Sequence, residues 1–274
     1  MAGTYLVQTD QGMFRSTDRG ATWTHVEGEF ADGTLVWRGG KLFAKGSTVP
    51  FSVMRSDDDG VTFDPHPAYD PQHTAATIRV LEFSVAPGGE VFAWLEFGTG
   101  INTVGVSTDH GDTWTHESME EFPTAFDAAN PNVFYGRTKR SRDHGLSFQP
   151  ITQGLTDVNG TLVSHPVDNH VYYYGSGQLY ESTNQGDLWT VIQSDLNSVA
   201  GKTPVVVAQD GSCTILRHLN STNTAYYGPT CGGTLTALTS PGVGLSQLLT
   251  YSSTGTRTVL AAPYGNGLYR ATLP

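Results

Sequence analysis

The sequence repeats one short stretch, Ser107-Thr108-Asp109-His110-Gly111-Asp112-Thr113-Trp114, and this stretch decides the fold. Near copies keep a Ser at the first place, an Asp or Asn at the third, a Gly at the fifth and an aromatic residue at the eighth. The other four copies run from Ser16 to Trp23, from Ser56 to Phe63, from Ser141 to Phe148 and from Ser182 to Trp189. Their starts are separated by about 34 to 51 residues, a period that is typical of repeat architectures.

Each copy has the composition of a tight turn between two strands. An Asp or Asn side chain at the third place can accept a hydrogen bond from a nearby backbone N–H, and the Gly provides the positive φ that a reversal needs. The aromatic residue then begins the next strand and buries a large apolar area. We therefore interpret the side chains at the third place as turn formers rather than catalysts or metal ligands; they are Asp18, Asp58, Asp109, Asp143 and Asn184.

Composition and charge argue against some classes of function. Of the 274 residues, 38% are hydrophobic and 15% charged, and 32 are Gly, which is typical of a globular, turn-rich chain. The formal net charge of −11 argues against a nucleic-acid partner. Because the chain has no apolar run of about 18 residues, we expect no membrane insertion. Residues 1–4 lack the basic and apolar regions of a signal peptide.

Two cysteines, Cys213 and Cys231, fall on the two arms of an expected hairpin that turns near Thr222. Equal spacing from this turn would place them opposite one another, so a disulfide between them is geometrically feasible. The alternative is a pair of small buried thiols, since only an oxidising compartment allows the bond. The sequons at Asn159 and Asn220 fit secretion, but a chain this rich in Ser and Thr contains such matches by chance.

Short alternating apolar runs between the turns predict strands in groups of four, without helical periodicity. The sixth group keeps only the Gly of its turn in register, and Gly267–Thr272 matches Gly12–Thr17 near the other end of the chain. We therefore predict an all-β fold in which residues 1–274 form a single domain, a seven-bladed β-propeller of 26 strands. The first blade would lack its inner strand and the last its outer strand. A six-bladed ring is the alternative.

The Ser-x-Asp-x-Gly-x-Thr-Trp repeats resemble Asp-boxes, also called bacterial neuraminidase repeats. Together with Asn130-Pro131-Asn132-Val133, they are similar to the propellers of sortilin-type receptors and xyloglucanases. This resemblance to the sialidase-like superfamily covers the whole chain and implies a β-propeller. It does not select a function, because these folds include enzymes, lectins, sorting receptors and assembly factors. Sialidase activity is disfavoured, since Arg15 and Arg270 lie inside repeats and no Arg-Ile-Pro stretch occurs.

A ligand site is expected on the face opposite the Asp-box turns, where second strands end. The residues expected to bind ligand there are Glu96, Arg137, Arg140, Tyr174 and Tyr264. Arg137 and Arg140 form a cationic spot that favours an anionic ligand, although they could instead neutralise neighbouring carboxylates. The proline-rich loop from Asp64 to His73 is interpreted as solvated rather than metal-binding, and we expect no metal and no cofactor.

Three functions are consistent with the sequence. The first is a non-catalytic recognition module that binds a glycan or a protein partner. The second is a glycoside hydrolase or polysaccharide lyase acting on an acidic glycan, for which Glu96, Asp70 and His73 are the candidate catalytic residues. The third is a structural component of a surface or virion assembly. An extracellular or surface-exposed location fits all three functions, and the oligomeric state stays open.

Overall fold

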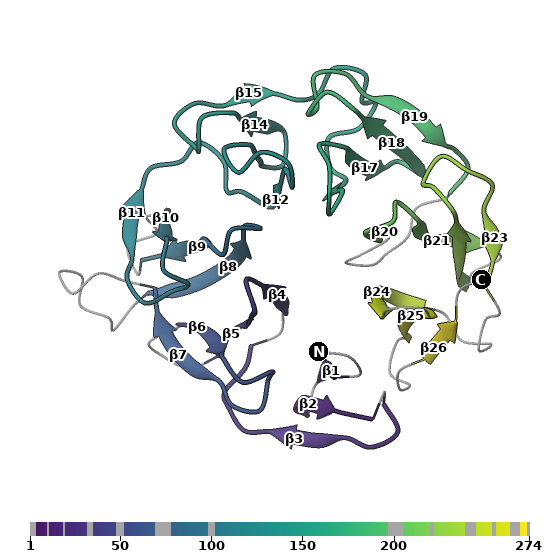
Figure 1. Ribbon diagram of the computed structural model, residues 1–274. Coiled ribbons are helices and arrows are strands. Elements are labelled where there is room, and N and C mark those ends of the chain that lie inside the picture. Colours follow the sequence, from purple (N-terminus) through teal and green to yellow (C-terminus); the bar gives the residue numbers. More distant parts are fainter. Residues whose placement is uncertain are drawn as a thin grey trace. The chain divides into compact units, whose positions relative to one another are not determined.

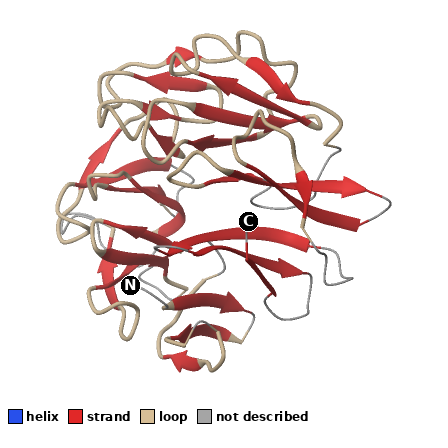
Figure 2. Cartoon of the chain, turned by 45° about the vertical axis from the view of Figure 1, so that its right-hand side comes forward, coloured by secondary structure: helices blue, strands red, loops and turns tan. Residues whose placement is uncertain are grey.

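The computed structural model consists of β-strands joined by turns and loops (Figures 1 and 2). The residues it describes are 4–9, 11–18, 20–31, 35–47, 52–68, 78–97, 102–196, 205–219, 222–238, 245–253, 256–263 and 269–272. No helix long and apolar enough to cross a membrane occurs in these ranges.

The strands pair with their neighbours in sequence to form seven antiparallel sheets, which we number in chain order. Sheet 1 contains β1 (Tyr5–Thr9), β2 (Gly12–Ser16) and β3 (Thr24–Val26). Sheet 2 contains β4 (Val36–Arg38), β5 (Lys41–Lys45), β6 (Ser52–Ser56) and β7 (Asp64–Pro67). Sheet 3 contains β8 (Arg79–Val85), β9 (Val91–Glu96), β10 (Asn102–Ser107) and β11 (Thr115–Glu117). Sheet 4 contains β12 (Ala125–Phe126), β13 (Phe134–Tyr135), β14 (Lys139–Ser141) and β15 (Gln149–Pro150); sheet 5 contains β16 (Thr161–Ser164), β17 (Val171–Gly175), β18 (Gln178–Ser182) and β19 (Thr190–Gln193); sheet 6 contains β20 (Val205–Val207), β21 (Cys213–Leu219), β22 (Thr222–Gly228) and β23 (Thr236–Ala237); sheet 7 contains β24 (Leu245–Ser253), β25 (Thr256–Pro263) and β26 (Tyr269–Thr272).

These sheets have the antiparallel four-strand plan of a β-propeller, and the described residues contain the expected 26 strands. The expected number of blades is wrong. Five sheets have the four strands of a complete blade, whereas sheets 1 and 7, at the two ends of the chain, have three strands each. A propeller with six blades, the alternative to our prediction of seven, is the fold that the findings support.

The chain divides into two compact units, Met1–Pro123 and Thr124–Pro274, which we call the N-terminal and C-terminal units. The boundary falls between sheets 3 and 4. Within the N-terminal unit, one apolar core joins sheets 2 and 3 through residues such as Phe43, Leu95 and Trp114. In the C-terminal unit, Tyr173 packs in a core with Trp189, whereas Tyr172 and Tyr174 pack in a different core with Ile215. Since alternate residues of a strand point to opposite faces, apolar cores cover both faces of sheet 5.

The repeated stretch forms the turn between the last two strands of its sheet, and we call it the turn motif. In the copy that begins at Ser107, the Ser107 hydroxyl donates to Asp109 Oδ1 (2.7 Å) and accepts from Gly111 N (2.7 Å). Asp109 also accepts from Thr113 N (2.8 Å) and from the Thr113 hydroxyl (2.6 Å). Gly111 has a φ of +98°, so the turn requires a left-handed residue at this place.

The bonds of the Ser hydroxyl and of the seventh-place N–H recur in the copies that begin at Ser16, Ser56, Ser141 and Ser182. The bond from a seventh-place hydroxyl recurs in the first three of these copies, whereas the fourth has Leu188 at that place. Burial raises the pKa of Asp109, but hydrogen bonds from Thr113 and Ser107 outweigh burial and lower the pKa to about 2. The third-place side chains are therefore engaged in closing turns. The stabilising contribution of the four Asp side chains is present above a pH of about 4, the unfolded pKa of an Asp, and is lost as the pH falls towards 2.

Substitution of Asp109 tests this role. We expect Asp109→Ala to lower the free energy of unfolding by about 0.5–2 kcal/mol, because Thr113 N and the Ser107 hydroxyl lose their acceptor. Asp109→Asn is the matched control. It retains the amide oxygen that Asn184 uses in sheet 5, where Leu188 N donates to Asn184 Oδ1 at 3.1 Å, so its effect should be smaller. Urea unfolding of the three proteins gives the comparison, and equal losses in the two variants would contradict the assigned hydrogen bonds.

Sheet 6 lacks the turn motif, and a covalent bond lies at the same end of this sheet. A disulfide joins Cys213, at the start of β21, to Cys231, in the turn between β22 and β23. We expected the two cysteines to lie directly opposite one another across the hairpin, and the observed pairing of the strands shows that they do not. The β21–β22 hairpin pairs Leu219 with Thr222, so Cys213 faces Gly228 and Cys231 lies beyond the end of β22. The disulfide therefore ties the turn to the strand, and does not cross the hairpin.

Candidate functional site

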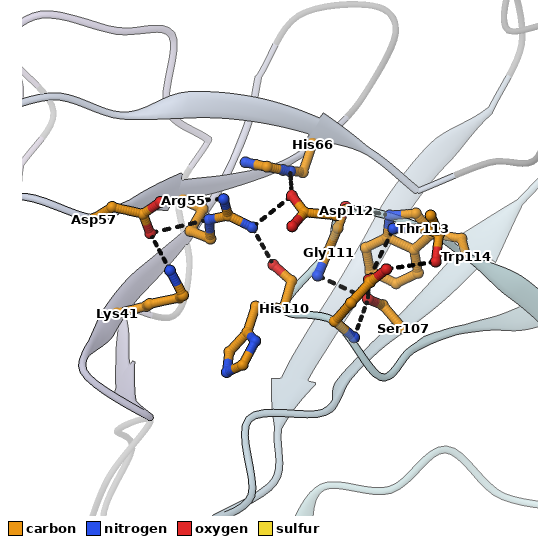
Figure 3. A network of polar contacts seen from close by, with 11 residues as sticks. Lys41, Arg55, Asp57, His66, Ser107, His110, Gly111, Asp112, Thr113 and Trp114 are labelled. Atoms are coloured by element: carbon orange, nitrogen blue, oxygen red, sulfur yellow. Dashed lines mark hydrogen bonds and ion pairs between the residues drawn. The ribbon is translucent and has the colours of Figure 1, made fainter.

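Each four-stranded sheet that carries a turn motif has two chemically different ends. At the turn end, arginine side chains cross from one sheet to the next, and Figure 3 shows one of them, Arg55. Arg55, the residue before the turn motif of sheet 2, donates to His110 O (3.1 Å) and Asp112 Oδ1 (2.7 Å) in the turn motif of sheet 3. The Arg55 side chain is 12% exposed and also bonds to Asp57.

The same contact recurs between other sheets. Arg140, the residue before the turn motif of sheet 4, donates to Gln185 O and to Asp187 Oδ1 (2.8 Å) in the turn motif of sheet 5. Arg15 donates to Asp59 O (2.9 Å) in the same way between sheets 1 and 2. In each case the acceptor carbonyl belongs to the fourth place of the motif, where the residue has a positive φ. These arginines join neighbouring sheets.

A histidine completes the contact between sheets 2 and 3 (Figure 3). His66 Nδ1 lies 3.3 Å from Asp112 Oδ1, and the His66 side chain is 16% exposed. Burial lowers the pKa of His66, and the neighbouring positive charge of Arg55 lowers it further, against the opposing effect of Asp112. The neutral form of the His66 imidazole is therefore favoured, because the charges of Arg55 and Asp112 already balance one another.

At the far end, opposite the turn motifs, sheets 4 and 5 present exposed polar groups. Arg137 lies in the β13–β14 loop and is exposed, and its Nη2 donates to Asn159 Oδ1 (2.9 Å) in the β15–β16 loop. Asp157 accepts from Asn159 N (2.8 Å) and from the Ser176 hydroxyl (2.8 Å) in the β17–β18 loop. Val158, between these polar residues, is 38% exposed. Three loops thus bring a cation, a carboxylate, a hydroxyl and an apolar side chain together, and we call this set the Arg137 site.

The predicted ligand residues separate into different environments. Arg140 lies within β14, not in the loop after the second strand, and it is 2% exposed. Tyr174 lies towards the far end of sheet 5 but is 6% exposed and packs in the core. Tyr264 lies outside the described residues. Among the described residues of the expected set in the C-terminal unit, only Arg137 is both exposed and at the far end of its sheet.

Of the three predicted catalytic residues, the structure describes Glu96 alone. Glu96, at the far end of sheet 3, has a side chain that is 35% exposed and lies 3.7 Å from Arg79 Nη1. Asp70 and His73 lie outside the described residues. Among the residues that are described, no group of three or more His, Cys, Asp or Glu side chains is placed to hold a metal ion.

The sequence contained a signal for the contacts that were missed. Sheets 1, 2 and 4 have an Arg directly before the turn motif, and sheets 3 and 5 have an Asp at the sixth place of the motif. The pairs Arg55–Asp112 and Arg140–Asp187 therefore follow the sequence repeat. In contrast, nothing in the motif pattern indicates the contact between Arg137 and Asn159. It depends on two irregular loops of different lengths.

Comparison with known proteins adds information about the fold. No family model and no curated protein matches the sequence. YCF48 from Cyanidioschyzon merolae is similar in structure, with a TM-score of 0.59 and 12% identity over 97% of this chain and 90% of that protein. YCF48 bound to a D1 peptide is also similar, with a TM-score of 0.57 and 12% identity over 92% of this chain and 84% of that one.

A puromycin-hydrolyzing peptidase from Mycobacterium tuberculosis is similar as well. Its TM-score is 0.62 at 13% identity, and the match covers 95% of this chain but only 46% of the peptidase. At identities this low, similarity of structure shows the fold and not the function. The chain is a β-propeller protein, and the solved structures that it resembles include a peptide-bound protein and part of a peptidase.

Proposed function

We propose that this chain is a non-catalytic recognition module that binds a protein partner through the far ends of its sheets. The observation that carries the proposal is the contrast between two arginines of sheet 4. Arg140 is buried and donates to groups of sheet 5, whereas Arg137 is exposed and donates to a single described acceptor through Nη2. Arg137 can therefore form a bidentate contact with a carboxylate of a partner.

A protein partner is favoured over a glycan by the aromatic residues. Sugar rings commonly stack on exposed aromatic faces, but Tyr173, Tyr174 and Tyr180 of sheet 5 are at most 6% exposed. The Arg137 site instead combines charged and polar groups with the exposed Val158, which is the mixed composition of a protein interface. The structure of YCF48 bound to a D1 peptide is a precedent for a peptide on a propeller of this size. The repeats are proposed to be Asp-boxes, on the turn bonds described above.

Two further features fit this proposal. The disulfide between Cys213 and Cys231 supports an oxidising location, such as a cell surface or the extracellular space. Glu96, the one candidate catalytic residue that lies among the described residues, pairs with Arg79 at 3.7 Å.

Arg137→Glu tests the site. On an array of synthetic acidic, basic and neutral peptides, we expect the parent protein to bind acidic peptides and Arg137→Glu to bind them at least about tenfold more weakly, because the ion pair becomes a repulsion. Arg38→Glu is the matched control. It makes the same charge change at an exposed residue of the turn end of sheet 2, and should bind as the parent does.

A parallel glycan array with a reducing-sugar assay separates the other functions. Binding of glycans without peptides, or release of sugar, would contradict a non-catalytic protein-binding module. Equal binding by Arg137→Glu and the parent, with both folded by circular dichroism, would show that the site lies elsewhere.

A further inference from the structure

The charge of the chain is divided unequally between its two units. The N-terminal unit, Met1–Pro123, contains 18 Asp and Glu against seven Lys and Arg. The C-terminal unit, Thr124–Pro274, contains eight of each. The formal net charge of −11 therefore belongs to the N-terminal unit alone. Such a field attracts cationic partners and raises their rate of association.

An aromatic patch lies at the far end of sheet 3 in this acidic unit. Trp94 of β9 and Phe122, which follows β11, are half-buried, and their rings stack with centroids 6.0 Å apart and an interplanar angle of 20°. Leu81, at a bulge in the neighbouring β8, is 38% exposed. Large aromatic side chains that are only partly covered are the residues that most often anchor protein interfaces.

Two carboxylates lie on the same face of the sheet as Trp94. Glu82 is the partner of Trp94 across β8 and β9, and it is exposed, with Lys45, which donates to Leu81 O at 2.9 Å, as a neighbouring cation. Glu96 lies two residues after Trp94 and therefore points to the same side. Its ion pair with Arg79 is long, at 3.7 Å, and the Arg79 side chain is 64% exposed, so this pair contributes little stability. We call Leu81, Glu82, Trp94, Glu96 and Phe122 the Trp94 patch.

We propose that the Trp94 patch docks a basic segment of a protein partner, with a lysine or arginine over the aromatic rings and between the two carboxylates. A cation of this kind is attracted to the face of a Trp ring and to carboxylates at once. Leu81 accepts the apolar part of the segment. We propose a basic segment because the net negative charge of the N-terminal unit would repel an acidic one. The inference does not depend on the Arg137 site, which lies in the other unit and takes the opposite charge.

The test uses two fluorescein-labelled peptides, Lys-Leu-Arg-Gly-Lys-Leu-Arg and Glu-Leu-Asp-Gly-Glu-Leu-Asp, and fluorescence anisotropy. The parent chain should bind the basic peptide, and the affinity should fall as salt rises from about 50 to 500 mM. Glu82→Gln with Glu96→Gln should weaken this binding about tenfold or more while leaving the shape of both side chains unchanged. The acidic peptide should not bind the patch.

Glu27→Gln with Glu29→Gln is the matched control, since it removes the same charge from the same unit after β3, in sheet 1. It should leave binding of the basic peptide within about twofold of the parent. If the two double variants weaken binding equally, the field of the whole unit binds the peptide and the patch does not. If the Glu82→Gln, Glu96→Gln variant binds as the parent does, or if the parent does not bind, the inference is wrong. If Arg137→Glu binds acidic peptides as well as the parent does, that result counts against the proposed function and not against the inference about the Trp94 patch.

Discussion

Replacing Arg140 with methionine is expected to lower the free energy of unfolding by about 2–4 kcal/mol, although methionine fits an apolar core better than arginine does. The Arg140 guanidinium is 2% exposed and holds both the carbonyl of Gln185 and the carboxylate of Asp187. Removing one partner of a buried ion pair typically costs about 3–5 kcal/mol. We expect a smaller loss than this range, because the Asp187 side chain is 49% exposed and water can solvate it.

Arg142 provides the matched control, because it pairs with the same carboxylate. Its Nη2 donates to Asp187 Oδ2 at 2.7 Å, but its side chain is 47% exposed. Arg142→Met should therefore lower the free energy of unfolding by less than about 1 kcal/mol. Urea unfolding of the parent and the two variants measures both effects. Equal losses would mean that burial does not distinguish the two arginines, and that Arg140 is not a structural link between sheets 4 and 5.

The turn motif explains how much of the fold could be predicted. It has a fixed length and a fixed hydrogen-bond pattern, so each copy marks one reversal between the last two strands of a sheet. That was sufficient to predict an all-β propeller with 26 strands. It was insufficient for the number of blades, because sheets 1 and 7 have three strands each and the motif carries no information about how strands at the two ends of the chain are grouped.

The candidate site was predicted less well, for a physical reason. Exposure of a strand residue depends on which neighbours cover each face, and an alternating pattern cannot show this when both faces are covered. Tyr174 was expected at a ligand site, but cores on both sides of sheet 5 leave it 6% exposed. Arg140 was misassigned for a related reason. The contacts that bury it come from Gln185 and Asp187, which are more than 40 residues away in sequence.

The error in the register of the cysteine hairpin leads to a second large effect. Because Cys231 lies in the turn beyond β22, the disulfide is in the place where other sheets have the hydrogen bonds of the turn motif. Gln193, at the end of β19, donates to Cys231 O (3.2 Å) and to Gly233 O (2.8 Å), so this turn also links sheet 6 to sheet 5. The closed loop spans 18 residues, for which chain entropy in the unfolded state predicts a stabilisation of about 3 kcal/mol.

We therefore expect the Cys213→Ala, Cys231→Ala variant to lose about 3 kcal/mol of unfolding free energy, with sheet 6 becoming the least protected part of the C-terminal unit. Urea unfolding measures the total effect, and amide hydrogen exchange locates it. A phosphine reductant should destabilise the parent to the level of the variant and leave the variant unchanged. If reduction leaves the parent as stable as before, or if the loss of protection spreads evenly over sheets 4, 5 and 6, the hydrogen bonds from Gln193 hold this turn without the disulfide.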